Sequence, residues 1–135
     1  MKELKVLAEA GSLEQVTDFV NGELEAADCP AKALMQIDLA VEEIFVNIAS
    51  YAYRDKPEGG YAVIRIDAGN GAARITFEDC GIPFDPTARE DPDRTAPADE
   101  RKIGGLGIFL TKKVMDEVRY EHRGGRNLLT VRKTF

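Results

Sequence analysis

The 135-residue sequence has little that would favour a disulfide-bonded, metal-binding or membrane-spanning protein. Its two cysteines, Cys29 and Cys80, lack the spacing of a metal-binding motif, and we expect free thiols in a reducing cytoplasm more than a disulfide. No apolar run approaches the roughly 20 residues that span a bilayer, and the N-terminal segment lacks the uninterrupted apolar stretch of a secretory signal. These absences favour a cytoplasmic protein without a membrane segment.

Positive charge is also low relative to negative charge. The sequence has 18 lysines and arginines and 24 aspartates and glutamates, which gives a net charge of −6. The average surface would repel a phosphate backbone or an anionic membrane, so we expect no direct nucleic-acid partner, although a local basic patch would still be compatible with this charge. The single histidine, His122, stands in a strand-like pattern and is interpreted as structural. The length fits one domain over residues 1–135.

Hydrophobic periodicity and turn residues predict an α/β protein. Ser12 and Gln15 have the pattern of a capping box, and Gly69-Asn70-Gly71 has that of a tight hairpin turn. The segment 80–107 holds four of the six prolines and is predicted to be a long loop, of the kind that is usually either functional or disordered. The predicted elements are a strand within 3–10, helices over about 12–27, 31–53 and 108–117, and strands at 61–68, 73–79, 118–123 and 127–135. This order predicts a two-layer α/β sandwich, with a mixed, mostly antiparallel sheet and helices on one face.

The second predicted helix contains the stretch LAVEEIFVNIASYAYRD, in which Glu43 and Asn47 are one turn apart. They lie about 40° apart around the helix and away from its apolar stripe, which contains Val41, Ile44 and Ile48. A solvated helix face would explain such a pair. Alternatively, Asn47 supplies an amide oxygen to Mg²⁺ and Glu43 is a carboxylate base, because Mg²⁺ often takes one or two protein ligands and the rest from water and phosphates.

The stretch FEDCGIPFDP places Asp79 at the end of a strand and Gly81 in the turn that follows. Aspartate and glycine are common in such turns for backbone reasons alone. The functional alternative is that Asp79 is a buried acceptor. An ionised carboxylate can accept a hydrogen bond from the amine of adenine but cannot donate one to the carbonyl of guanine.

The stretch RKIGGLGIFL places Gly104, Gly105 and Gly107 before a predicted helix. Backbone N–H groups at such a junction can approach an anion, although the spacing fits neither a P-loop nor a Rossmann motif. Arg101 and Lys102 lie just upstream and could meet terminal phosphates or simply face solvent.

Taken together, the order and spacing of these three motifs resemble the GHKL-type ATPases, which include gyrase-like enzymes and the catalytic domains of sensor histidine kinases. The short length, the N-terminal strand and helix, and the stretch EDCGIPFDP look most like the anti-sigma factor serine/threonine protein kinase branch. The resemblance implies a Bergerat-type ATP-binding fold with three main helices, ATP and Mg²⁺ as cofactors, and an ATP lid at about residues 87–103.

Site roles carry over by matching positions. The resemblance implies that Glu43 is the general base, Asn47 the Mg²⁺ ligand and Asp79 the adenine-binding aspartate, with Gly81 in its turn. Pro83 departs from the pattern, because many relatives have a second glycine there.

The remaining roles concern the phosphates and the adenine. Gly105 and Gly107 match the glycines beside the phosphates, with Gly104 next to them. Thr130 matches a strand threonine that usually helps to hold the adenine. Arg101 resembles a basic residue near the terminal phosphate, and Lys102 is its rival.

The function implied by this resemblance is an ATP-binding anti-sigma regulatory factor and kinase that phosphorylates a serine or threonine of a STAS-type anti-anti-sigma partner. A sigma factor would be the other partner, and a homodimer is expected. The main alternative is a nucleotide-gated binding module that no longer transfers phosphate. A fragment of a histidine kinase is less favoured, because no phosphoacceptor-helix pattern is present, and a purely structural protein would have to contain three ordered motifs by accident.

Overall fold

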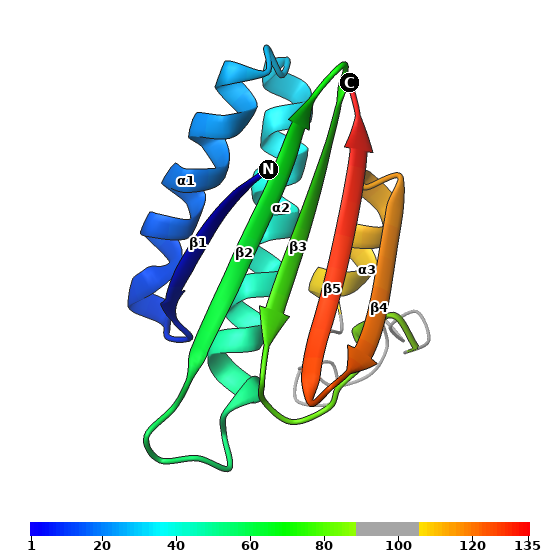
Figure 1. The fold of residues 1–135 in the computed structure, drawn as a ribbon. Helices are drawn as coiled ribbons and strands as arrows, with labels where there is room; N and C mark the ends of the chain where they lie inside the picture. The colour runs from blue at the N-terminus through cyan, green and yellow to red at the C-terminus, as the bar shows by residue number, and fades with distance from the viewer. Residues whose placement is uncertain (89–105) are drawn as a thin grey trace.

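The computed structural model describes residues 1–88 and 106–135, and this part of the chain forms a two-layer α/β sandwich (Figure 1). The strands are β1 (Lys2–Leu7), β2 (Tyr61–Gly69), β3 (Ala72–Asp79), β4 (Glu117–Arg123) and β5 (Arg126–Thr134). The helices are α1 (Leu13–Ala26), α2 (Ala31–Asn47) and α3 (Leu106–Val114), and all three cover the same face of the sheet (Figure 1). Both the predicted fold class and the three-helix layer are confirmed.

The sheet has the strand order β1-β2-β3-β5-β4, and its four pairings are all antiparallel rather than mixed. Tight turns join β2 to β3 and β4 to β5. In the first turn Asn70 and Gly71 have φ values of 54° and 78°, as the Gly-Asn-Gly pattern predicts. In the second, Gly124 and Gly125 have φ values of 60° and 77°. Both turns therefore have the positive φ angles that match the twist of paired strands.

Alternation along the strands separates a buried face from an open one. In β3 the helix-covered side chains are Ala73, Ile75, Phe77 and Asp79. The apolar faces of α1 and α2 pack on this layer through Val16, Val20, Leu24, Ile37, Val41 and Ile44. The other face of the sheet carries the polar side chains, because no helix of the described residues covers it (Figure 1).

The helix ends differ from the sequence-based expectation. The second helix is α-helical only to Asn47 and continues as a π-helical turn, Ile48–Ala52. Ser12 makes no side-chain capping bond, because it has helical φ and ψ values in a 3₁₀ turn that leads directly into α1. The third helix ends at Val114, since the amide of Asp116 already donates to the carbonyl of Arg132 in the sheet. None of the helices in the described ranges is long and apolar enough to cross a membrane.

Candidate functional site

A mostly apolar cavity of about 150 Å³ lies between the helix layer and the ends of β3, β4 and β5. Its apolar lining consists of Ile44, Ile48, Ala52, Phe77, Ile82, Pro83, Phe84, Pro86, Ile108 and Leu129. Its polar lining consists of Asn47, Tyr51, Arg54, Asp79, Tyr120 and Asn127. An apolar cavity with a few convergent polar groups is typical of a small-molecule site.

Asp79 ends β3 and points into the helix-covered layer, where it is only 6% exposed. Its Oδ1 accepts two hydrogen bonds of 2.9 Å, from the amide of Gly81 and from Nδ2 of Asn127. Among the described residues, no donor reaches Oδ2, which leaves an acceptor for a ligand. Burial raises the pKa of Asp79, while the hydrogen bonds from Asn127 and Gly81 lower it.

Gly81 lies where the turn after β3 meets the end of the π-helical turn. A Cβ atom at this position would overlap the backbone carbonyl of Ala52, so the site has no room for a side chain. The next residue strengthens the contact, because the amide of Ile82 donates to the carbonyl of Ala52 at 2.7 Å. Glycine is therefore required by close backbone approach.

Asn47 and Glu43 lie on α2, away from its buried stripe, as their spacing predicts. Asn47 is the last residue of α2 and lines the cavity, and no group of the described residues hydrogen-bonds to its side-chain amide. The π-helical turn begins at the next residue, and π turns within helices are frequent at functional sites. Glu43 is half-buried, and its pKa is raised by burial and then by the negative charge of Glu42. A carboxylate with a raised pKa is better suited to accept a proton near neutral pH.

A metal ion would have few protein ligands here. In the described ranges, no group of three or more histidines, cysteines, aspartates and glutamates could hold one. The half-exposed amide of Asn47 fits a hard cation that takes most of its ligands from water and phosphates. The residues present therefore suit Mg²⁺ arriving with a nucleotide better than a permanently bound metal.

Asn127 and Tyr120 also belong to the site, although neither residue lies in one of the three sequence motifs. Asn127 is 6% exposed and donates from Nδ2 to Asp79 and to the carbonyl of Ile82, at 2.9 and 3.0 Å. The hydroxyl of Tyr120 donates to Oδ1 of Asn127. A signal for Asn127 was available in β5, where it alternates in phase with the core residues Leu129 and Val131.

Thr130 lies on the opposite face of the sheet from Asp79, which corrects its expected place beside the adenine. In the antiparallel register Thr130 pairs with Thr76, and their hydroxyls are 3.1 Å apart on the open face. Asp79 instead pairs with Asn127. Because successive strand residues point to opposite faces, a position three residues along from Asn127 cannot share its face.

The glycine and lid positions are only partly described. Arg101, Lys102, Gly104 and Gly105 lie outside the described residues, as does the expected lid except for its first two positions. Gly107 lies in the first turn of α3. At the start of the expected lid, the 3₁₀ turn Pro86–Ala88 is bonded to α3, because Nζ of Lys112 donates to the carbonyl of Thr87 at 3.2 Å.

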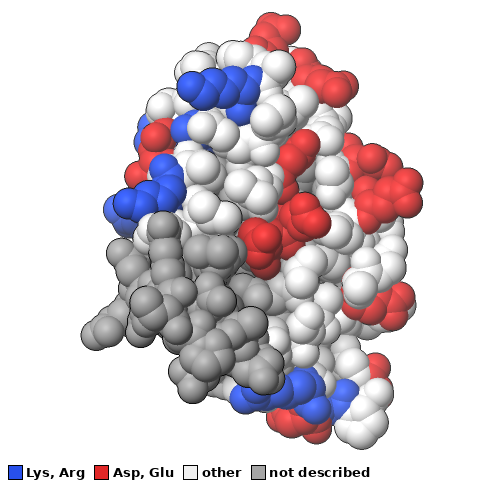
Figure 2. Space-filling model, turned by 180° about the vertical axis from the view of Figure 1, so that it is seen from behind, with Lys and Arg blue, Asp and Glu red and all other residues white. Residues whose placement is uncertain are grey.

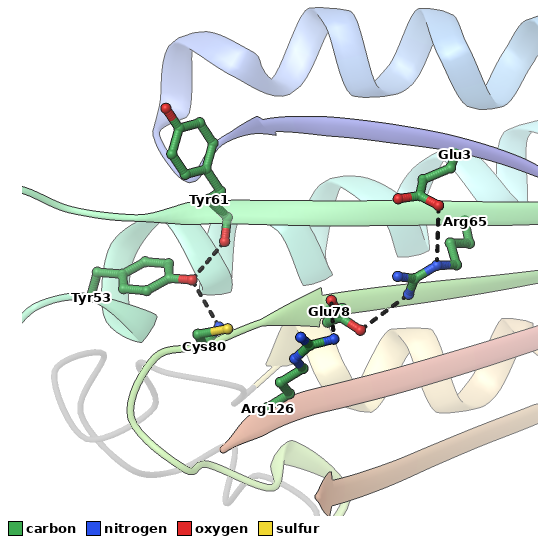
Figure 3. A network of polar contacts seen from close by, with 7 residues as sticks. All are labelled: Glu3, Tyr53, Tyr61, Arg65, Glu78, Cys80 and Arg126. Atoms are coloured by element: carbon green, nitrogen blue, oxygen red, sulfur yellow. Dashed lines mark hydrogen bonds and ion pairs between the residues drawn. The ribbon is translucent and has the colours of Figure 1, made fainter. Parts of the chain in front are cut away.

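Tyr53 connects the end of the π-helical turn to β2 and to the residue that follows β3 (Figure 3). Its hydroxyl donates to the carbonyl of Tyr61 at 2.6 Å and accepts from the amide of Cys80 at 2.8 Å (Figure 3). Gly60 leaves room for the ring, since a Cβ atom there would overlap it. Cys80 and Cys29 are both free thiols, as expected.

Charge is unevenly distributed on the helix-covered face (Figure 2). Acidic side chains run through its centre and along one side, whereas basic ones gather on the other side and at one end (Figure 2). The helices α1 and α2 together contain seven acidic residues, namely Glu14, Asp18, Glu23, Glu25, Asp38, Glu42 and Glu43. A partner that approaches the centre of this face therefore meets negative charge (Figure 2).

Comparison with known proteins gives matches over nearly the whole chain. The family model described as "Histidine kinase-like ATPase domain" matches residues 6–133. The serine-protein kinase RsbW of Staphylococcus aureus (strain bovine RF122 / ET3-1) is 26% identical over 127 residues, which cover 91% of this chain and 80% of that protein. RsbW of strain MSSA476 is 25% identical with the same coverage.

Two solved structures have the same fold. The RsbU and RsbW domains of Rv1364c from Mycobacterium tuberculosis match with a TM-score of 0.62 and 18% identity, over 99% of this chain. The match spans only 32% of that longer chain. The SiaB-SiaC complex from Pseudomonas aeruginosa matches with a TM-score of 0.62 and 15% identity, over 100% of this chain and 90% of the other.

Proposed function

This chain belongs to the histidine kinase-like ATPase domain family, and on that premise we propose that it binds Mg-ATP and phosphorylates a serine or threonine of a partner protein. The observation that carries the proposal is the buried carboxylate of Asp79 in the lining of an apolar cavity, with Oδ2 available to a ligand. An ionised carboxylate accepts hydrogen bonds only, which suits the amine of adenine. The apolar lining would hold the faces of the base.

Asn47, which also lines the cavity, would hold Mg²⁺ through its amide oxygen. The ion, when bound, would neutralise charge on the phosphates. Gly104, Gly105 and Gly107 would place backbone N–H groups near the phosphates, and Arg101 or Lys102 would meet the terminal one. Only Gly107 among these five lies in the described part of the chain.

Glu43 would act as the general base in the transfer. Its carboxylate would accept the proton of the incoming hydroxyl as the oxygen forms a bond to the γ-phosphorus. The bond from that phosphorus to the bridging oxygen breaks, and ADP leaves with the electron pair. Half-burial of Glu43 and its raised pKa support this role.

The proposed acceptor is a STAS-type anti-anti-sigma protein, and the proposed second partner is a sigma factor. The matched relatives named serine-protein kinase support a protein acceptor. The acidic helix face would favour release of the product, because a phosphoryl group adds about −2 charge to the partner. We further propose that the protein acts in the cytoplasm and as a homodimer.

A nucleotide-gated binding module is the alternative, since the identity to the kinases is only about a quarter. Such a module would keep the sites for the nucleobase and the phosphates. It would regulate its partner without using Glu43 as a general base. Glu43→Gln separates the two functions, because it would abolish phosphotransfer and leave nucleotide-dependent partner binding unchanged.

A thermal-shift titration with Mg-ATP, Mg-ADP and Mg-GTP tests the nucleotide site. A ligand at 100 times its dissociation constant adds about 2.7 kcal/mol to the free energy of unfolding, which raises Tm by several degrees. We expect stabilisation by the adenine nucleotides and none by Mg-GTP, with the effect lost in Asp79→Asn. Phosphate incorporation into purified STAS-domain proteins, followed by intact-mass spectrometry, then tests the kinase. No shift with any nucleotide at millimolar concentration would refute the proposal.

A further inference from the structure

We propose that Asn127 and Tyr120 are positioning residues that set nucleobase selectivity, because they leave the polar end of the cavity with hydrogen-bond acceptors and no free donor. We define this polar end as the hydrogen-bonded group of Asp79, Tyr120 and Asn127, apart from the other polar lining residues, Asn47, Tyr51 and Arg54. The inference rests on the proposed nucleotide binding and goes beyond it, because it assigns selectivity to two side chains outside the three motifs.

The side-chain amide of Asn127 has two N–H donors. Nδ2 lies 2.9 Å from Oδ1 of Asp79 and 3.0 Å from the carbonyl oxygen of Ile82. A third acceptor, the carbonyl oxygen of Gly81, is 3.4 Å away. Both amide hydrogens are therefore used within the protein, and three acceptors on one side fix which way the amide faces.

The hydroxyl of Tyr120 has a single hydrogen to donate. It donates to Oδ1 of Asn127, and it is also hydrogen-bonded to the backbone of Phe84. The hydrogen bond to Oδ1 therefore also fixes the orientation of the Asn127 amide, on the side opposite Nδ2. The hydroxyl of Tyr120 has no second proton to offer a ligand.

What remains at this end for a ligand is an acceptor surface, chiefly Oδ2 of Asp79. A base whose edge carries an exocyclic amine can donate to it. A base with a carbonyl at the same place would bring an acceptor against acceptors, and an unpaired buried polar group is costly. The side chains that fix Asp79 therefore help to determine which base binds.

Ile82 and Phe84 form part of the cavity wall. The carbonyl of Ile82 is held by Asn127, its amide is held by Ala52, and the backbone of Phe84 is hydrogen-bonded to Tyr120. Loss of Asn127 would leave Oδ1 of Asp79 with the Gly81 amide alone and would free the carbonyl of Ile82. The carboxylate of Asp79 and the cavity wall at Ile82 would then both lose their fixed geometry. Discrimination between nucleobases depends on that geometry.

The test is isothermal titration calorimetry with three probes. They are Mg-ADP, the Mg complex of purine riboside 5′-diphosphate, which is ADP without the exocyclic amine, and Mg-tripolyphosphate, which has no base. We expect the native protein to prefer ADP over the purine analogue by about tenfold or more, the scale of one lost hydrogen bond to a charged group. Asn127→Leu, of similar volume, should reduce this preference to about threefold or less and leave the affinity for tripolyphosphate unchanged.

Tyr120→Phe removes one oxygen atom and should shift the preference in the same direction by a smaller factor. Thr130→Val is the matched control, because it lies on the same strand but on the open face, and it should keep the native preference. If circular dichroism shows that Asn127→Leu does not fold, the preference of Tyr120→Phe for ADP over the purine analogue tests the proposal instead.

The outcomes separate the two proposals. If the native protein binds ADP selectively and the folded variants keep its preference, the roles of Asn127 and Tyr120 are refuted while the nucleotide site stands. If the native protein binds none of the adenine or purine nucleotides, both proposals fail.

Discussion

The backbone amide of Ile82 donates a 2.7 Å hydrogen bond to the carbonyl oxygen of Ala52. Ala52 is the last residue of the π-helical turn, and a carbonyl at a helix end lacks an intrahelical partner. The turn after β3 therefore caps the helix that carries Asn47 and Glu43. This bond links the turn that follows Asp79, the proposed ligand of the nucleobase, to the helix that carries Asn47 and Glu43, the residues proposed to act at the phosphates.

Gly81→Ala should disrupt that junction. The added Cβ atom would overlap the carbonyl of Ala52, which is backbone and cannot move aside cheaply. We expect the free energy of unfolding to fall by about 1–3 kcal/mol, the usual cost of overpacking, and nucleotide binding to weaken with it. Urea unfolding followed by circular dichroism measures the first effect.

Gly22→Ala is the matched control for this substitution. Gly22 lies inside α1, and no atom lies within 4 Å of a Cβ added there. The same chemical change should stabilise the protein by about 0.5–1 kcal/mol, because alanine is the better helix former. Equal effects of the two substitutions would argue against the proposed role of close contact at Gly81.

Asp79→Asn should change the pH dependence of stability in the nucleotide-free protein. Burial raises the folded-state pKa of Asp79 above its ordinary value of 3.8, so between these two values the native state binds more protons than the unfolded state. The free energy of unfolding of the native protein therefore falls as pH rises through this window, and the loss persists at neutral pH.

The asparagine variant lacks this titration, while its side-chain oxygen can still accept from Gly81 and Asn127. Its stability relative to the native protein should increase between about pH 3 and about pH 7. Urea unfolding at several pH values in this range checks the trend. A difference that stays constant with pH would show that the carboxyl titrates normally.

Glu43→Gln should separate chemistry from binding. Removal of a general base typically lowers kcat by about 10²–10⁴-fold, whereas the affinity for Mg-ADP should stay within about threefold. Glu42→Gln provides the neighbouring control, since Glu42 is exposed and lies further around the helix. Comparable losses of phosphotransfer in both variants would point to general charge rather than to a base at residue 43.

Tyr53→Phe should loosen the turn after β3 without removing the ring. The variant loses the bond to the carbonyl of Tyr61 and leaves the amide of Cys80 without its acceptor. We expect a loss of about 1 kcal/mol in the free energy of unfolding and faster amide exchange at residues 80–82. Tyr61→Phe keeps the backbone carbonyl that Tyr53 uses and should leave that exchange unchanged.

Much of the fold can be predicted from local sequence patterns. The alternation in β2 and β3 and the Asn70-Gly71 turn predicted a hairpin that the structure confirms, because turn chemistry and strand twist are local properties. The capping box at Ser12 was wrong for an equally local reason, since the preceding 3₁₀ turn already brings the chain into helical geometry.

The site was only partly predictable. Helical spacing placed Glu43 and Asn47 on one side of α2, and the strand-end pattern placed Asp79 beside Gly81. Resemblance alone predicts Thr130 beside the adenine, whereas strand phase predicts that Thr130 faces away from Asp79. The alternation of Asn127 with Leu129 and Val131 would have assigned Asn127 to the inner face.

By itself, then, the sequence determined the elements, their order and the three motifs, because helix periodicity, strand alternation and turn residues act over a few neighbours. Tertiary structure alone decided that β3 pairs with β5 so that Asp79 faces Asn127, and that Gly81 abuts Ala52. These contacts join segments far apart in the chain, and their geometry depends on register and on packing of the helices against the sheet. Which polar groups keep a free lone pair for a ligand is consequently a property of the folded protein.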